Sequence, residues 1–145
     1  MHWADVLVEC NISSFMLEMK ETAFVCSNAG PKSLILLDEL GRATSNEDGV
    51  AIAWSVSEYL LSKHAMTFFV THYGQLCQLN SVYPGVQNQH LEASIPGDEN
   101  GEISYTHKVT NGPCNIAADY GVHMGLSCGW PIDVLENVRS FFSCC

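Results

Sequence analysis

Two adjacent carboxylates, Asp38 and Glu39, directly follow an apolar run in the segment SLILLDELGRATS. A second apolar run, MTFFVTH, ends in Thr71 and His72. Paired carboxylates at the end of a buried strand serve nucleotide hydrolysis: the first holds Mg²⁺, commonly through water, and the second orients and polarises the attacking water. A histidine beside them can hydrogen-bond the γ-phosphate and respond to its loss. These residue types therefore point to a site for a nucleotide phosphate, provided that the fold brings the two segments together.

The elements that would bring these segments together are predicted from the hydrophobic pattern. Residues 33–37 are apolar without alternation, which indicates a short strand buried on both faces, and residues 66–72 indicate a second strand. Residues 49–62 between them predict an amphipathic helix of about four turns. Strand, helix and strand within ~40 residues form a βαβ unit, so the strands should be parallel neighbours. Ligands bind at the carboxyl ends of such strands, so the polar residues there should face one crevice.

Each strand end, taken alone, is explained as well by a simpler interpretation. Asp38 and Glu39 would then merely begin a solvated loop, and His72 would be a surface residue. Their joint occurrence at the carboxyl ends of the two strands of one βαβ unit favours the nucleotide site. A turn at residues 41–44, followed by a capping-box pattern in SNED at residues 45–48, supplies the helix start that this unit requires.

Further elements are predicted on both sides of this unit. Residues 13–29 indicate a helix, with Ser13 or Ser14 as its N-cap and a Gly-Pro pair as its stop. The turn-rich stretch PGDENG lies between two strand-like segments and predicts an antiparallel hairpin. A last helix should begin with Pro131 in its first position. Its apolar stripe would hold Val134, Leu135, Val138, Phe141 and Phe142. The predicted fold class is α/β, a parallel sheet with flanking helices and an antiparallel hairpin.

Composition limits what this segment does. The 145 residues suit one domain, and 47% of them are hydrophobic, enough for an ordered core. Sixteen acidic residues against six basic ones give a formal charge of -10, which argues against direct binding of nucleic acid by this segment. The seven cysteines show no zinc-binding spacing and are expected to be reduced thiols. No apolar run approaches the ~18 residues that a membrane span needs.

Three segments give the sequence a family resemblance. SSFMLEMKETA, LILLDELGRATS and TFFVTHYGQL, in this order and spacing, closely resemble the ATPase domain of the MutS mismatch-recognition family, a branch of the ABC-type ATPases. The resemblance continues through VQNQHLE and YGVHMGLSCGWPIDVLENVRSF, so it covers nearly the whole chain. Details such as KSLILLDELGR, EYLLS and YPGVQNQH look most like the meiotic branch of the family, its fourth eukaryotic homologue.

This resemblance implies a fold and partners. Residues 1–145 would be the C-terminal part of a MutS-type ATPase domain with a sheet like that of P-loop NTPases. ATP and Mg²⁺ are the implied cofactors, and another MutS-family subunit is the implied partner in a homo- or heterodimer. The parent protein would be an ATP-dependent clamp that meets DNA through regions absent here, in the nucleus. It would act in mismatch repair or in meiotic recombination.

The resemblance also implies roles for individual residues. Asp38 matches the Walker B carboxylate for Mg²⁺, Glu39 matches the catalytic carboxylate, and His72 matches the switch histidine that meets the γ-phosphate. Residues 41–45, which include Thr44 and Ser45, match a loop that runs along the dimer interface beside the partner's nucleotide. Ser13 and Ser14 match a serine-bearing signature segment that completes the ATP site of the opposite subunit, where a helix N-terminus presents free N–H groups to phosphate.

Two departures from the family pattern affect the expected function. No G-x-x-x-x-G-K-[ST] phosphate loop occurs, and the family places that loop upstream of Ser13, so we expect a chain truncated at its N-terminus. Ala43 replaces a loop glycine, which would impede a positive φ or a close backbone approach.

Three hypotheses follow from these departures. In the first, the chain is part of an ATPase domain, and this part has no activity by itself. The second is a non-enzymatic dimerisation fragment that contributes signature and loop residues to a partner's ATP site. The third is a decayed gene fragment.

Overall fold

The computed structural model describes residues 13–94, 104–114 and 120–143. The chain divides into two compact units, Met1–Val86 and Gln87–Cys145. The elements of the first unit are α2 (Ser14–Asn28), β1 (Leu34–Asp38), α3 (Asn46–Ser62), β2 (Met66–Val70), the 3-10 helix η1 (Gly74–Gln78) and α4 (Leu79–Val82).

The predicted βαβ unit is confirmed. Strands β1 and β2 pair in parallel over their whole length, from Leu34 opposite Met66 to Asp38 opposite Val70. Helix α3 connects them and begins at Asn46, three residues before the predicted start. Its N-cap is Ser45, whose Oγ accepts a hydrogen bond from the backbone N–H of Asp48 at 3.2 Å. The same hydroxyl donates to the Asp48 carboxylate at 2.8 Å, so the predicted capping pattern holds the first turn of α3.

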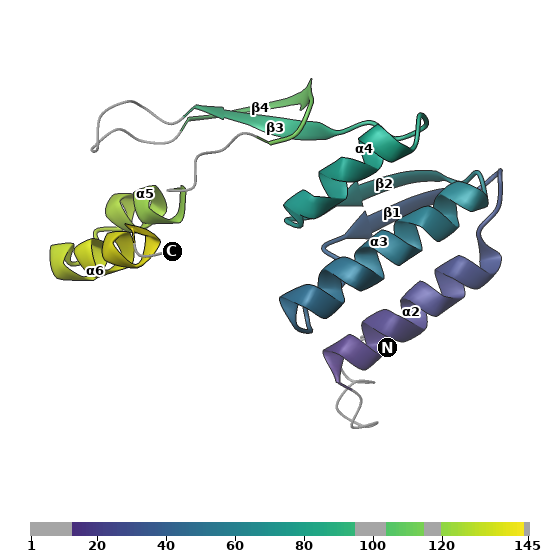
Figure 1. Cartoon of the computed structure of the whole chain (residues 1–145), viewed down its shortest axis with the longest axis horizontal. Coiled ribbons are helices and arrows are strands. Elements are labelled where there is room, and N and C mark those ends of the chain that lie inside the picture. The colour runs from purple at the N-terminus through teal and green to yellow at the C-terminus, as the bar shows by residue number, and fades with distance from the viewer. Residues whose placement is uncertain (1–12, 95–103, 115–119, 144–145) are drawn as a thin grey trace, which may run out of the picture. The chain divides into compact units, whose positions relative to one another are not determined.

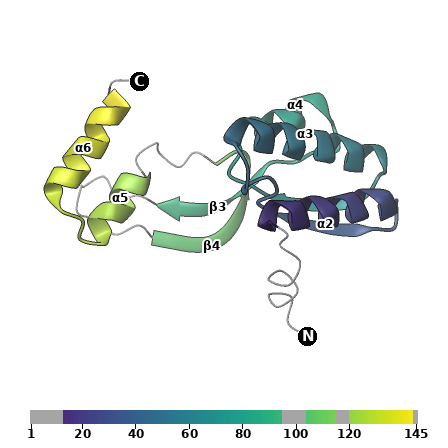
Figure 2. The ribbon, with the colours of Figure 1, turned by 90° about the horizontal axis from the view of Figure 1, so that it is seen from below.

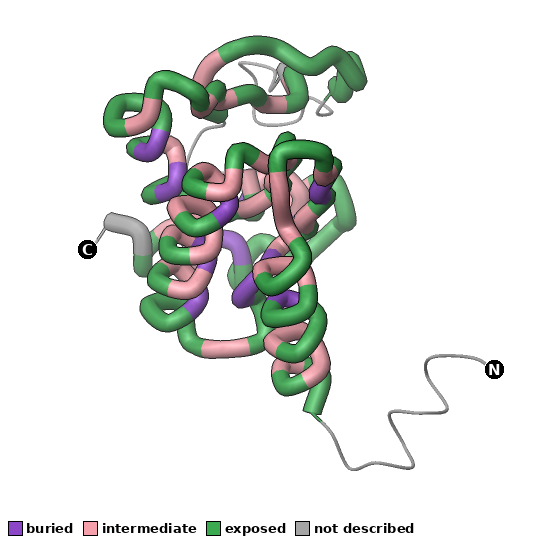
Figure 3. Tube along the Cα trace, turned by 90° about the vertical axis from the view of Figure 1, so that its right-hand side faces the viewer, coloured by how far each residue is buried: buried purple, intermediate pink, exposed green. Residues whose placement is uncertain are grey.

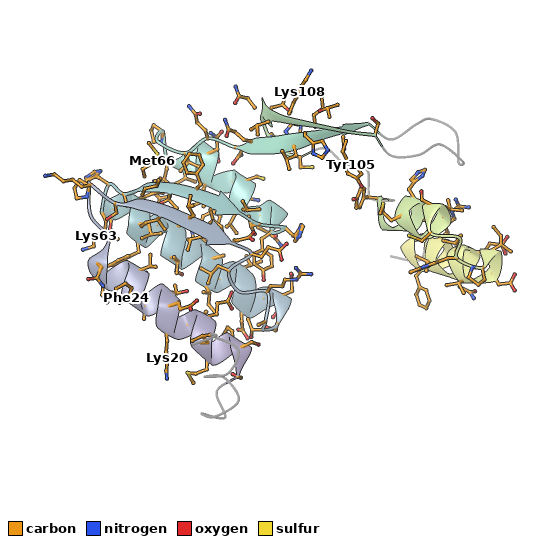
Figure 4. The ribbon with its side chains drawn as sticks, turned by 180° about the vertical axis from the view of Figure 1, so that it is seen from behind. Lys20, Phe24, Lys63, Met66, Tyr105 and Lys108 are labelled. Carbon is orange, nitrogen blue, oxygen red and sulfur yellow. The ribbon has the colours of Figure 1, made fainter. Side chains whose placement is uncertain are left out.

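Only one face of this sheet is covered by the described residues of the first unit. Helix α3 packs on this face (Figure 1). On α3, Ala53 is fully buried and Leu60 is 1% exposed. Ile35 points to this side and is 7% exposed. On the other side Leu36 is 73% exposed and Phe68 is 56% exposed. Figure 4 looks onto that open side, with the strands in front of α3, and Figure 3 shows how few residues are buried.

The prediction that residues 33–37 are buried on both faces is therefore wrong for this structure. A fully apolar strand is typical of a parallel sheet with helices on both sides, but in the first unit α3 and α4 lie on one side of the strands and no described helix of that unit covers the other. The remaining apolar side chains of the open face are Leu34, Met66 and Val70, each more than half exposed.

Helix α2 follows the sequence prediction. Ser13 is the N-cap, and its Oγ accepts from the backbone N–H of Met16 at 3.2 Å. The helix ends at Asn28, and Ala29 is extended before the Gly-Pro pair. The structure thus decides between the two candidate caps: Ser14 is the first helical residue.

The second unit contains the predicted hairpin. Strands β3 (Gln89–Ser94) and β4 (Ser104–Asn111) pair antiparallel, with a bulge between Leu91 and Ala93. The turn stretch PGDENG lies outside the described residues. Within the described residues, no helix is long and apolar enough to cross a membrane.

Two helices complete this unit. Helix α5 (Tyr120–Ser127) was not predicted, and α6 (Ile132–Ser143) begins one residue after Pro131. Leu135 of α6 is 1% exposed and packs tightly against Gly125 of α5. The predicted apolar stripe of α6 is only partly buried, because Val134 is 43% exposed and Phe141 is 75% exposed. The side chain of Phe142 lies outside the described residues.

Candidate functional site

The carboxyl ends of β1 and β2 bring the predicted polar residues together. Asp38, the last residue of β1, is opposite Val70 at the end of β2. Glu39 directly follows Asp38, and His72 lies two residues after Val70. An ion pair joins Glu39 Oε1 to His72 Nε2. The prediction that the two strand ends meet is confirmed. Thr71 faces its own turn instead, since its Oγ1 accepts from the backbone N–H of Tyr73 at 3.0 Å.

Glu39 is the centre of this group. Its second oxygen, Oε2, accepts from the guanidinium of Arg42, so each oxygen of the carboxylate has a partner. The hydrogen bond from Arg42 is the main reason that the pKa of Glu39 lies below its usual value. The charges of Arg42 and His72 lower this pKa further, and partial desolvation opposes them. At neutral pH Glu39 is therefore ionised.

Arg42 is a site residue that our sequence analysis did not identify. A signal for it existed: it has the opposite charge to Glu39 and follows it by three residues across a turn. Its side chain is 75% exposed, whereas the Glu39 side chain is 24% exposed. The arginine is thus the more accessible partner of the pair.

The backbone of Glu39 is unusual. Its φ is +51°, in the left-handed region that residues with a side chain rarely adopt. Such a conformation costs on the order of 1–3 kcal/mol and persists only where the surroundings impose it. Here the Glu39 N–H donates to the Val70 carbonyl at 2.8 Å, and the Glu39 carbonyl accepts from the Arg42 N–H at 3.2 Å.

A second left-handed residue, Gly41, lies two positions further along, with φ +89°. Its N–H donates to Glu18 Oε1 at 3.0 Å, and its carbonyl accepts from the Tyr73 hydroxyl at 2.9 Å. Gly49 of α3 also touches this turn, because a Cβ on Gly49 would lie 2.0 Å from the Tyr73 hydroxyl. Four segments of the chain therefore meet at one glycine. No sequence pattern indicated Glu18 or Tyr73 for this role.

The other predicted residues lie near the same end of the unit. The N-termini of α2 and α3 and the carboxyl ends of β1 and β2 are on one side in Figure 1. Ser13 and Ser14 are exposed at the start of α2, and Ser13 bonds within its own helix. Thr44 is partly buried. Ser45 is engaged as the cap of α3.

The loop residue Ala43 is compatible with its position. It is exposed, and it is not among the residues with a positive φ. The steric objection to a side chain at this position therefore does not apply in this structure.

A metal at this edge would need ligands beyond the protein. Among the residues that the structure describes, no group of three or more His, Cys, Asp or Glu side chains could hold a metal ion. Asp38 offers an exposed carboxylate. Mg²⁺ is commonly bound by one or two carboxylates together with waters and substrate phosphates. Asp38 therefore fits Mg²⁺ that arrives with a nucleotide and does not fit a dedicated protein cage.

The chain is similar to proteins of the MutS family. The family model of MutS domain V matches residues 3–144. The MutS protein homolog 4 of Homo sapiens is 48% identical over 108 residues, which are 72% of this chain and 12% of that protein. The DNA mismatch repair protein MSH4 of Arabidopsis thaliana is 40% identical over 132 residues, 91% of this chain and 16% of that protein. The chain spans a small part of these relatives.

A bacterial protein is similar to the same extent. The DNA mismatch repair protein MutS of Caldicellulosiruptor bescii is 42% identical over 130 residues, which cover 88% of this chain and 14% of that protein. Similarity on this scale extends over both units of the chain. The family resemblance predicted from the motifs, including its likeness to the homolog 4 branch, is confirmed.

Proposed function

Because this chain belongs to the MutS family and matches its domain V, we propose that it supplies the hydrolytic side of an ATP site in a DNA-acting protein. The observation that carries the proposal is the ion pair between Glu39 and His72, which joins two strand ends at the carboxyl edge of a parallel pair. We assign the parent protein to the nucleus and to meiotic recombination, since relatives named homolog 4 or MSH4 are among its matches. The sheet would then be part of a larger sheet of the P-loop type.

In this proposal Glu39 orients the water that attacks the γ-phosphate. An ionised carboxylate is required for that role, and Arg42 and His72 keep Glu39 ionised. Both Glu39 oxygens are engaged, one by each partner, so one of them must be exchanged for water before hydrolysis. The side chains of Arg42 and His72 are 75% and 81% exposed, so water can replace either partner.

Asp38 would hold Mg²⁺ in this site. The metal, when bound, neutralises charge on the phosphate oxygens. Asp38 is in position to hold this metal, because it forms the last residue pair of β1 and β2 with Val70 and directly precedes Glu39. The two neighbouring carboxylates can therefore divide the tasks, one for the metal and one for water.

The remaining predicted residues serve a neighbouring subunit in this proposal. Ser13 and Ser14 begin a helix whose free N–H groups suit a phosphate of the partner's nucleotide. Thr44 and Ser45 follow the turn toward the same interface. DNA would be bound by other parts of the parent protein, because this segment carries a net charge of -10.

The test joins these 145 residues to the phosphate-loop portion of a MutS-family relative and measures ATP turnover. We expect Glu39→Gln to keep ATP binding and to lower kcat by ~10² or more, because the amide cannot polarise water as a carboxylate does. The control is Glu47→Gln, an exposed acid in the first turn of α3, which should leave kcat unchanged. Normal turnover in Glu39→Gln would remove Glu39 from its proposed role. The 145-residue chain alone should show no turnover.

A second candidate is a non-enzymatic role in dimerisation. It is favoured by the sequence, which has signature and loop residues but no phosphate-loop motif. In this case the chain would act on a partner's ATP site through Ser13, Ser14 and the loop of residues 41–45. Adding the chain to a full-length relative should then change the relative's ATPase rate, and a Ser13→Ala/Ser14→Ala variant should not. An unchanged rate with the unaltered chain would exclude this candidate.

A further inference from the structure

The turn at Gly41 is fixed by two side chains that are remote in sequence. Glu18, from the second turn of α2, accepts from the Gly41 N–H at 3.0 Å. Tyr73, directly after His72, donates its hydroxyl to the Gly41 carbonyl at 2.9 Å. Both hydrogen-bonding groups of this one peptide position are thus satisfied by side chains from different elements.

The packing around the turn leaves no room for adjustment. Gly41 is buried, and the preceding Leu40 is 3% exposed. A Cβ on Gly41 would lie 2.8 Å from the Gly49 Cα. A shift of the turn toward α3 is therefore blocked, and a shift away from it would break the bonds to Glu18 and Tyr73.

The position of Glu18 is not explained by a gain in stability. Its second oxygen, Oε2, is buried and has no hydrogen-bond partner within the described residues. Desolvating a carboxylate oxygen without a partner is unfavourable, and one hydrogen bond to a peptide N–H contributes only about 0.5–3 kcal/mol net. The arrangement suits a residue whose role is to hold one peptide in place.

We propose that Glu18 and Tyr73 are positioning residues for Glu39. By fixing Gly41, two residues beyond it, they impose the left-handed backbone at Glu39 and hold its carboxylate against His72. The turn also connects the three segments that carry predicted site residues, because Glu18 is on α2, which Ser13 caps, and Tyr73 adjoins His72. The catalytic consequence rests on the proposed function, but the geometry does not.

The first experiment uses the 145-residue chain and measures hydrogen exchange of the Gly41 amide by NMR. In Glu18→Ala this amide should exchange roughly 2- to 10-fold faster, and Glu18→Gln, which keeps an acceptor oxygen, should restore protection. Glu21→Ala, an exposed change on the same helix, is the control. Unchanged exchange in Glu18→Ala would overturn the proposal.

The tyrosine is tested in the same chain by its effect on Glu39. Tyr73→Phe removes only the hydroxyl, and we expect the pKa of Glu39 to rise toward its usual value as the turn loosens. The matched control is Tyr83→Phe, which removes a hydroxyl bonded to Glu58 at 2.6 Å, away from the turn. An equal rise in both variants, or none in Tyr73→Phe, would contradict a positioning role.

The catalytic consequence is measured in the ATP-competent fusion described above. Glu18→Ala and Tyr73→Phe should lower kcat ~10-fold or more and leave the nucleotide Kd unchanged, because a small misplacement of a reacting group costs rate and not binding. If Glu39→Gln abolishes turnover and these variants do not lower kcat, the positioning role is wrong and the proposed function stands. If Glu39→Gln keeps turnover, the proposed function fails, and the exchange experiment alone decides whether the two side chains fix the turn.

Discussion

Replacing Gly49 with alanine tests the close approach at the Gly41 turn. A Cβ on Gly49 would lie 2.0 Å from the Tyr73 hydroxyl oxygen and 2.7 Å from the Gly41 carbonyl oxygen. Real Cβ contacts essentially never fall under 3.0 Å, so both neighbours must move. The tyrosine can rotate away, but it then loses its hydrogen bond to Gly41. The carbonyl belongs to the backbone and moves only with the turn.

The expected cost follows from these contacts. Overpacking a close contact destabilises by about 1–3 kcal/mol, and the lost hydrogen bond adds about 1 kcal/mol. Alanine in place of glycine within α3 recovers about 1 kcal/mol of helix propensity. We therefore expect Gly49→Ala to lower the free energy of unfolding by about 1–3 kcal/mol, with an unchanged m-value in urea unfolding followed by circular dichroism.

Two further variants make this result specific. Gly74→Ala, at the first residue of η1, is the control, because a Cβ there meets nothing within 4 Å, and it should change stability by less than about 0.5 kcal/mol. Adding Tyr73→Phe to Gly49→Ala should recover part of the loss, since it removes the shortest contact. If Gly49→Ala is as stable as the unaltered chain, the four segments do not meet at Gly41 as described.

Two other predictions concern the core and the ionised group. Leu60→Ala should cost about 2–5 kcal/mol in urea unfolding, whereas Leu36→Ala on the open face should cost less than about 1 kcal/mol; equal costs would mean that the open face is covered in solution. Arg42→Gln should raise the pKa of Glu39, measured by NMR titration of its carboxyl carbon, while Lys20→Gln on α2 should not. Because the pKa of Glu39 is lower in the folded state, the ionised Glu39 stabilises the fold above the unfolded pKa, and this stabilisation is lost as pH falls through the folded pKa. In Arg42→Gln the loss of stability at acid pH should be smaller. An unchanged pKa of Glu39 in this variant would show that the ion pair does not persist.

Local patterns were sufficient to predict α2, the βαβ unit, the hairpin and α6, but not η1, α4 or α5. The apolar runs that end at Asp38 and Val70, with a helix between them, required a parallel pair, and that pairing placed Glu39 and His72 side by side. Ser45 was recognisable as a cap because a cap depends on residues only three positions away, and the same pattern narrowed the cap of α2 to Ser13 or Ser14.

The same patterns did not predict which face of the sheet is buried. Leu36 and Ile35 are equally apolar neighbours, yet one is 73% exposed and the other 7%. An apolar strand indicates that both faces can be buried, but which faces are covered depends on how many layers pack against them. Within the described residues of the first unit there is one layer of helices.

The sequence by itself determined which residues form the proposed site: their types, their order and their place at the ends of two strands. Only the tertiary structure decided how that chemistry is held. Glu18 and Tyr73 are separated from Gly41 by 23 and 32 residues, and no periodicity links positions so far apart. The left-handed backbone of Glu39 and its contact with Arg42 likewise follow from how the turn is packed, because a side chain alone does not impose a strained φ.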